Sequence, residues 1–129
     1  MRLLLDTQIL VIMAKNQLNR LDDRTVSALV APQAELFVSV ASLWEIAIKT
    51  RLGKLDPGTT LDRLPELVET MGLSQVAILA SHVIEAVYPE PPTRDPFDRL
   101  LLAQCLVEGM RLVTLDRALT DHPAAYAPK

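Results

Sequence analysis

Four acidic residues are the candidates for chemistry in this sequence. Asp6, Asp98 and Asp116 each stand where an apolar strand is expected to end or a helix to begin, and Glu45 stands about one turn into a helix that follows a strand. In open α/β sheets the ligand site lies beyond the carboxyl ends of the strands. The four carboxylates are therefore predicted to converge on one rim of a sheet, although they lie far apart along the chain.

Carboxylates gathered in this way repel one another, and burial without partners would leave some of them protonated. A divalent cation resolves this repulsion. Because the set supplies oxygen ligands without cysteine or histidine, Mg²⁺ or Mn²⁺ suits it better than zinc. Such ions activate water and stabilise the leaving oxygen in phosphodiester hydrolysis, so these residue types favour a metal-dependent hydrolase.

Each acid also has a purely structural interpretation, which the residues alone leave open. Asp6, Asp95 and Asp98 are suited to the N-termini of helices, where a carboxylate accepts from free backbone N–H groups and meets the positive end of the helix dipole. Glu45 precedes Lys49 by four residues, which is the spacing of an ordinary surface ion pair on a helix.

The segment that carries Asp98 reads as a buried helix within residues 94–109. Asp95 is its expected N-cap, and Pro96 suits the first helical position because its missing N–H costs nothing there. Residues 100–107 are almost all apolar, which predicts burial on every side. Gly109 is expected to end the helix.

Short apolar segments elsewhere alternate with segments of helical spacing. Strands are expected at residues 3–5, 36–40, 75–79 and 112–115. Helices are expected at residues 8–14, between 22 and 32, and at 41–52, 61–71, 81–87 (capped by Ser81) and 117–120. This alternation predicts one α/β domain over residues 1–129, with a parallel sheet covered on both faces. Residues 122–129 are expected to form a tail or a weak edge strand.

The composition bounds the class of protein. Half of the 129 residues are hydrophobic, which suggests that a partner or a second copy covers part of the apolar surface. No run approaches the length of a membrane span, and the N-terminus lacks the apolar core of a signal peptide. The single cysteine, Cys105, is expected to be buried, and the chain is expected to be cytoplasmic. A net charge of −3 argues against a surface that coats nucleic acid, but it is compatible with a metal-dependent nuclease.

Aromatic and histidine side chains offer little competing chemistry. Trp44 is predicted to lie in the core or at an interface rather than to stack on bases, because no second aromatic residue is close to it in the sequence. His82 follows the expected helix cap Ser81, and His122 lies in the tail, so neither is expected to hold a metal.

Four segments carry a resemblance to a known family. They are LLLDT at residues 3–7, SVASLWEIAIKTRLGKL at 39–55, RDPFDRLLLAQCLVEG at 94–109 and LVTLD at 112–116. Together they resemble PIN-domain proteins, specifically the VapC-type toxins of bacterial toxin–antitoxin pairs. The resemblance implies a three-layer α/β/α sandwich around a mostly parallel sheet of four or five strands. It also implies Mg²⁺ or Mn²⁺, a homodimer, a cognate antitoxin protein, and endonucleolytic cutting of RNA such as transfer RNA.

The same resemblance assigns roles to single residues. The residues that match the acidic quartet of the family, and so the expected catalytic and metal-binding residues, are Asp6, Glu45, Asp98 and Asp116. Asp6 and Asp98 are expected to be the main metal ligands, and Asp116 to complete the site. Glu45 is expected to bind a second ion or to position the attacking water. Thr7, Asp95 and Thr114 are expected to support the acids. One departure is Gln8, where many relatives carry histidine.

Candidate contacts to RNA phosphates are Lys49, Arg51, Arg94, Arg99 and Arg117. Two alternatives stand beside the nuclease. The first is a PIN-fold module that binds its antitoxin or RNA without cutting. The second is a phosphoryl-transfer domain of receiver or dehalogenase type, which would need a second acid close to Asp6; the following Thr7 and Gln8 do not supply one.

Overall fold

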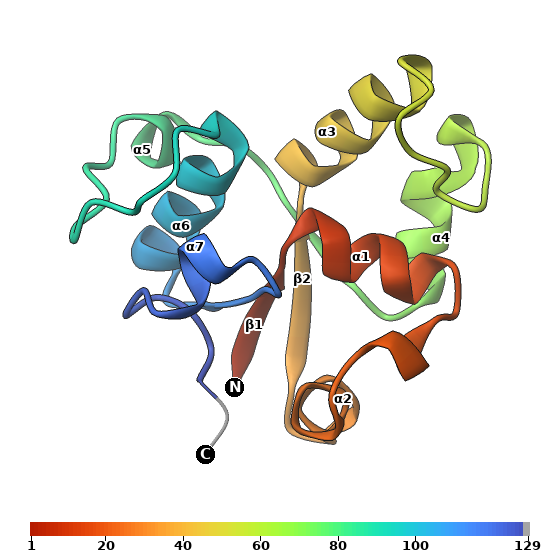
Figure 1. Ribbon diagram of the computed structural model, residues 1–129, viewed down its shortest axis with the longest axis horizontal. Helices are drawn as coiled ribbons and strands as arrows, with labels where there is room; N and C mark the ends of the chain where they lie inside the picture. The colour runs from red at the N-terminus through yellow and green to blue at the C-terminus, as the bar shows by residue number, and fades with distance from the viewer. Residues whose placement is uncertain (128–129) are drawn as a thin grey trace.

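The computed structural model, which describes residues 1–127, is built on a four-stranded parallel sheet with helices on both faces (Figure 1). The strands are β1 (Arg2–Leu5), β2 (Glu35–Ser39), β3 (Ser74–Val76) and β4 (Arg111–Val113), and they are ordered β3-β2-β1-β4. This arrangement confirms the α/β fold class and the four-strand, parallel version of the predicted sheet.

Strand β1 lies inside the sheet and is buried from both sides. Leu3, Leu4 and Leu5 are all fully buried, as expected for a parallel strand that is covered on both faces. Leu3 and Leu5 belong to one hydrophobic cluster and Leu4 to the other, because successive side chains of a strand point to opposite faces.

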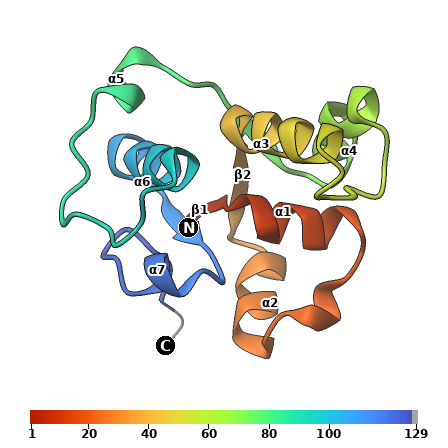
Figure 2. The same cartoon turned by 45° about the horizontal axis from the view of Figure 1, so that its top comes forward.

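The helices divide between these two clusters. On the face of Leu3 and Leu5 lie α1 (Thr7–Ala14), α2 (Asp23–Val30) and α4 (Leu64–Thr70), with 3₁₀ turns at Leu18–Arg20 and Leu61–Arg63. On the face of Leu4 lie α6 (Pro96–Glu108) and α7 (Arg117–Thr120), and α5 (Ala80–Val83) packs on α6. Figure 2 shows the two groups of helices on either side of the strands.

Helix α3 (Val40–Arg51) joins the two halves. Its residue Ile46 belongs to the first cluster and its Ala41 to the second, and the helix contacts both α1 and α6. Because α3 begins directly after β2, it stands above the carboxyl edge of the sheet (Figure 1). Glu45 is thereby carried to that edge, as the sequence predicts.

The segment that follows α4 and contains β3 and α5 differs from its prediction. Strand β3 ends at Val76 rather than at residue 79, and Leu79 is half exposed. The expected helix at 81–87 with a Ser81 cap is wrong at both ends, because α5 covers only Ala80–Val83. The backbone N–H of Leu79 donates to His82 Nδ1 at 3.0 Å, so a histidine three residues on takes the capping role.

The predictions for the cysteine and for the C-terminal tail agree with the structure. Cys105 is buried, and burial raises the pKa of its thiol to about 12. The tail contributes one parallel bridge, between Leu112 and Ala125, while residues 128 and 129 lie outside the described part of the chain. Within residues 1–127, no helix is both long enough and apolar enough to cross a membrane.

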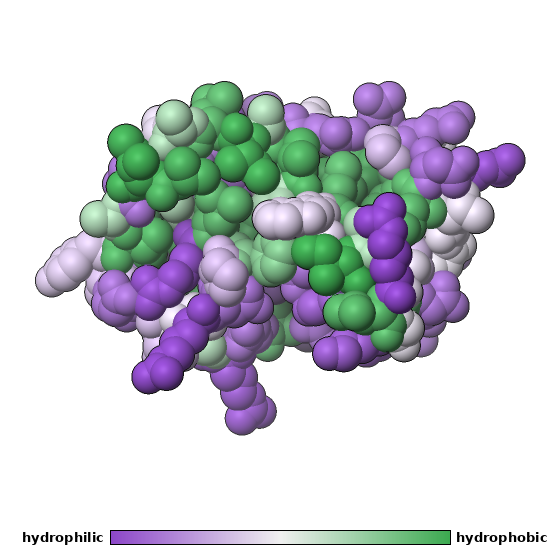
Figure 3. All heavy atoms as spheres, turned by 90° about the horizontal axis from the view of Figure 1, so that it is seen from above, coloured by the Kyte–Doolittle hydropathy of each residue, from purple (hydrophilic) through white to green (hydrophobic). Residues whose placement is uncertain are grey.

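Apolar side chains gather on one part of the surface, on the side of the molecule where α5 lies (Figure 3). The large exposed ones on α5 and directly before and after it are Ile78, Leu79, Val83 and Ile84. Val83 is 60% exposed and Ile84 is 80% exposed, which is unusual for side chains of this type. The apolar surface expected from the composition is therefore present in this region.

Candidate active site

The acidic residues singled out in the sequence lie around one cavity of about 350 Å³ at the carboxyl edge of the sheet. The strand order changes direction between β1 and β4, and such a switch point is where ligands bind in open α/β sheets. The residues that line the cavity come from five parts of the chain: Asp6, Thr7, Gln8, Val11, Glu45, Lys49, Lys54, Leu55, Asp95, Asp98 and Asp116. All four acids of the predicted quartet are among them.

Asp6 and Asp116 reach the cavity because each follows a strand and starts a helix. Asp6 caps α1, with its Oδ1 accepting from the backbone N–H of Ile9 at 2.9 Å. Asp116 caps α7 in the same way, accepting from Ala118 at 2.9 Å. The backbone N–H of Asp6 also donates to the carbonyl oxygen of Val113 at 3.0 Å, which holds the ends of β1 and β4 together. The capping role and the position at the cavity therefore coexist in both residues.

Asp95 and Asp98 lie at the start of α6. Asp95 is the N-cap, with its Oδ1 accepting from the Phe97 backbone at 2.9 Å, and Pro96 follows at the first helical position as predicted. Asp98 accepts from the Thr93 hydroxyl at 3.1 Å, and Thr93 Oγ1 in turn accepts from the backbone N–H of Asp95 at 3.1 Å. Thr93 was not identified from the sequence, since an isolated threonine after a run of prolines carries no recognisable signal.

Glu45 is the most enclosed member of the set after Asp6, at 7% exposure. Its Oε1 accepts from the Thr7 hydroxyl at 2.6 Å, and its Oε2 accepts from Lys49 Nζ at 2.5 Å. Ser42 Oγ lies 3.0 Å from Thr7 Oγ1 and completes this chain of hydroxyl groups. The ion pair with Lys49 that the spacing predicts is present, but its carboxylate is buried instead of lying on the surface.

The two threonines that were predicted to support the acids, Thr7 and Thr114, make different contacts. The Thr7 hydroxyl bonds to Glu45 and not to the neighbouring Asp6. Thr114 Oγ1 accepts from the backbone N–H of Asp116 at 3.0 Å, and its hydroxyl lowers the pKa of Asp6. Thr114 therefore links the first and the last acid.

The carboxyl groups are destabilised in their ionised form. Burial raises the pKa of Asp6, and the charges of Asp116 and Glu45 add to that effect. Burial, followed by the nearby charge of Asp95, raises the pKa of Asp98 to about 6. A hydrogen bond to Glu45 raises the pKa of Lys49, because the carboxylate stabilises the ammonium. This is the electrostatic state of an acidic cavity that favours cations.

The donor set fits a hard divalent cation, since its ligand atoms are carboxylate oxygens that repel one another. Within residues 1–127, however, no group of three or more histidine, cysteine or acidic side chains stands close enough together to hold an ion. In Asp6, Asp95 and Asp116 the capping bond engages only Oδ1 of the carboxylate. In Glu45 both oxygens are engaged, by Thr7 and by Lys49. An ion bound through Oε2 of Glu45 would therefore require Lys49 to move.

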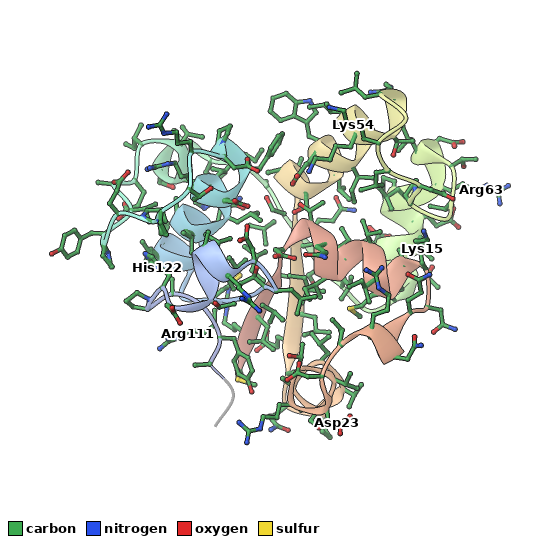
Figure 4. The ribbon with its side chains drawn as sticks, in the orientation of Figure 1. Lys15, Asp23, Lys54, Arg63, Arg111 and His122 are labelled. Atoms are coloured by element: carbon green, nitrogen blue, oxygen red, sulfur yellow. The ribbon has the colours of Figure 1, made fainter. Side chains whose placement is uncertain are left out.

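The predicted phosphate contacts are not gathered in the same way. Of the five candidates, Lys49 lines the cavity, and Arg51, Arg94, Arg99 and Arg117 do not. Arg99 is paired with Glu90 and donates to the Thr93 carbonyl oxygen at 3.2 Å. Lys54 lines the cavity without having been predicted, because nothing in the sequence distinguishes a lysine in the loop after α3 from other surface lysines (Figure 4).

Trp44 is not a core residue, since it is 60% exposed. Its ring contacts Phe97 edge to face, with centroids 5.4 Å apart and an angle of 71° between the planes. Phe97 on α6 is thus an aromatic neighbour of Trp44 that lies far from it in the sequence. Placement in the core was wrong, and the placement of Trp44 at an interface stays a prediction.

Comparisons with known proteins place this geometry in context. The PIN domain family matches residues 3–124. Among solved structures, the fold is similar to that of a chain in the VapBC2 complex from Rickettsia felis, which is bound to a DNA fragment from its promoter. The TM-score is 0.59 at 15% identity, over 97% of this chain and 96% of that one. No curated protein matches the sequence closely enough to be reported as a relative.

Proposed function

The chain belongs to the PIN domain family, and from that premise we propose that it is a metal-dependent endoribonuclease, the VapC-type toxin of a toxin–antitoxin pair. One observation carries the proposal. Asp6, Glu45, Asp98 and Asp116 come from four separate parts of the chain and line one cavity at the switch point of the sheet. Glu45 and Asp98 cap no helix, since the N-caps of α3 and α6 are Ser39 and Asp95, so capping does not explain why they lie beside Asp6 and Asp116.

Asp6, Asp98 and Asp116 are proposed to hold Mg²⁺ or Mn²⁺. When bound, the ion would lower the pKa of water and stabilise the negative charge that develops on the phosphate. Asp98 is preferred to Asp95 as the third ligand because it matches the third acid of the family's quartet, while Asp95 stands at the N-cap of α6. Asp95 is proposed to keep the start of α6, and hence Asp98, in position.

Glu45 is proposed to serve the reaction either as ligand of a second ion or as the acceptor that orients the attacking water. Thr7 holds its Oε1 at 2.6 Å, so the carboxylate is fixed on the wall of the cavity. The substrate phosphate would be met by Lys54, which lines the cavity from the loop after α3. Arg51, Arg94, Arg99 and Arg117 lie outside the cavity, and we propose them as contacts to phosphates further along the RNA.

The proposed partners are a cognate antitoxin and a second copy of the chain. The similarity in fold to a chain of a VapBC2 complex supports the antitoxin. The exposed apolar side chains on and beside α5 support a surface that a protein covers. The phosphoryl-transfer alternative has no support from the family match, and the non-cutting module differs from the proposal only in lacking activity.

The test is cleavage of end-labelled single-stranded RNA and transfer RNA by the purified protein. We expect defined fragments with Mg²⁺ or Mn²⁺ and none with EDTA, and none from the Asp98→Asn variant in either condition. Intact RNA in the presence of Mn²⁺ with the wild-type protein would leave the non-cutting module as the better description. Cleavage that persists in EDTA would contradict metal dependence.

A further inference from the structure

Both oxygens of the Glu45 carboxylate are already engaged by donors from the chain itself. The Thr7 hydroxyl lies 2.6 Å from Oε1 and Lys49 Nζ lies 2.5 Å from Oε2. Glu45 is 7% exposed, so few solvent positions compete with these two donors. An oxygen that is held by an ammonium group is not available to a metal ion until that ammonium moves away.

Lys49 also belongs to the wall of the acid cavity. Five carboxylates and two ammonium groups line the cavity, which gives it a formal charge of −3 when every group is ionised. Of the two ammonium groups, Lys49 is paired directly with an acid, and Lys54 has no ion pair with any residue in the described range 1–127. The side chain of Lys49 is 45% exposed, so it has a path toward solvent that the buried Glu45 does not have.

We propose that Lys49 is a built-in counter-ion of this cavity, which holds Glu45 in the ion-free protein and lowers the affinity of the site for divalent cations. The inference rests on the proposed metal-dependent function, with Glu45 in the first of its two proposed roles, as an ion ligand, and it names a residue that tunes the ion affinity. For Glu45 to bind an ion through Oε2, the contact between Lys49 Nζ and Oε2 would have to break, and the half-exposed ammonium group would move toward solvent.

Two consequences follow from the electrostatics. Without an ion, loss of the lysine charge leaves a buried carboxylate with one partner fewer, and this destabilises the fold. With an ion, loss of the same charge removes a repulsion and frees a ligand, and this tightens binding. A residue that only supports the structure produces the first effect and not the second.

The experiment compares Lys49→Met, which keeps the chain length and removes the charge, with Lys49→Arg, which keeps the charge. Mn²⁺ is titrated into each protein by calorimetry, and thermal unfolding is followed in EDTA and in saturating Mn²⁺. We expect Lys49→Met to bind Mn²⁺ about 3- to 10-fold more tightly than the wild type. We also expect it to have a lower Tm in EDTA and a larger gain in Tm from Mn²⁺. Lys49→Arg should stay close to the wild type in each measurement.

Repeating the Lys49→Met comparison in a Glu45→Gln protein separates an effect that acts through Glu45 from a general effect of charge. In Glu45→Gln protein the carboxylate is gone, so adding Lys49→Met should change the Mn²⁺ affinity by less than it does in the wild type. An equal change in both backgrounds would overturn the part of the inference that depends on Glu45. If Lys49→Met does not fold, Lys49→Gln takes its place, since glutamine removes the charge but retains a donor.

The outcomes distinguish this inference from the function on which it rests. If the wild type binds Mn²⁺ and Lys49→Met binds it equally or more weakly, Lys49 is not a competing counter-ion and the proposed nuclease is unaffected. If neither protein binds Mn²⁺, the metal-dependent function is wrong and the inference is wrong with it.

Discussion

The hydroxyl group of Thr93 donates a hydrogen bond to Asp98 Oδ2 at 3.1 Å, and among the described residues this is the one hydrogen bond that the carboxylate accepts. The bond lowers the pKa of Asp98, but burial and the neighbouring charge of Asp95 outweigh it, and the pKa is raised to about 6. The Asp98 carboxyl group therefore titrates close to physiological pH, and a larger fraction of it is protonated there than of an exposed aspartate.

This pKa predicts how the stability of the ion-free protein depends on pH. Because the folded pKa of Asp98 lies above its ordinary value of 3.8, the folded state favours the protonated form. The resulting stabilisation is complete below pH 3.8 and is lost as the pH rises through about 6. In EDTA, Asp98→Asn should therefore gain Tm relative to the wild type as the pH is raised from 4 to 8. A difference in Tm that stays constant over this range would contradict the raised pKa.

Replacement of single acids tests the shared site. Asp6→Asn, Asp98→Asn and Asp116→Asn should each lower the rate of RNA cleavage by about 100-fold or more, because each removes a charged ligand of the ion. Asparagine still accepts the capping hydrogen bonds of Asp6 and Asp116, so circular dichroism should show folded proteins. Asp56→Asn is the matched control, since Asp56 Oδ1 also accepts from a backbone N–H, that of Gly58 at 2.9 Å, but the residue does not line the cavity. Wild-type rates in all three site variants would contradict the assignment.

The hydroxyl of Thr7 should support both the fold and the site. Thr7→Val keeps the shape of the side chain and removes the donor to Glu45, which is a charged and buried acceptor. We expect urea denaturation in EDTA to show a loss of about 1.5–3 kcal/mol in the free energy of unfolding. Thr7→Ser retains the hydroxyl and should lose much less. An equal loss in the two variants would mean that packing of the methyl group, and not the hydrogen bond, stabilises this contact.

Lys54 should contribute more to RNA binding than Arg51, because Lys54 lines the cavity and Arg51 does not. In an Asp98→Asn background that does not cut RNA, Lys54→Ala should lower the dependence of log Kd on log salt concentration by about 0.7. Fluorescence anisotropy with a labelled single-stranded RNA measures this slope. A larger effect from Arg51→Ala would place the RNA on the outer face of α3 instead.

Gly109 tests the backbone of the helix that carries Asp98. Its φ is 68°, and a Cβ at this position would meet no atom within 4 Å, so any cost of substitution comes from backbone conformation alone. We expect Gly109→Ala to lose about 1 kcal/mol in the free energy of unfolding, with RNA cleavage unchanged. Gly109→Asn should lose less, because asparagine tolerates this conformation better. An equal loss for alanine and asparagine would contradict the conformational explanation.

The parts of the fold that could be predicted from the sequence are those whose signals are local. Asp95, Pro96 and Gly109 mark the two ends of α6, and the run of leucines in β1 marks a strand buried on both faces. The segment after β3 could not be predicted in the same way. Ile78 and Leu79 read as a continuation of the strand, but they leave the sheet and are exposed, and the start of α5 is set by His82.

The acids of the candidate site could be listed from the sequence, but their contacts could not. Whether Glu45 pairs with Lys49 on the surface or in a cavity depends on how α3 lies against α1, and no local pattern reports that packing. The bond from Thr7 to Glu45 spans 38 residues, and the contact of Trp44 with Phe97 joins two helices. Such long-range contacts arise only once the sheet order brings the elements together.

The most direct test of the central claim is the position of Mn²⁺ in crystals of the protein, located by its anomalous scattering. We predict a peak within coordination distance of the carboxylates of Asp6, Asp98 and Asp116. A crystal soaked at saturating Mn²⁺ that shows no peak in this cavity, or a peak held by other side chains, would contradict the shared metal site.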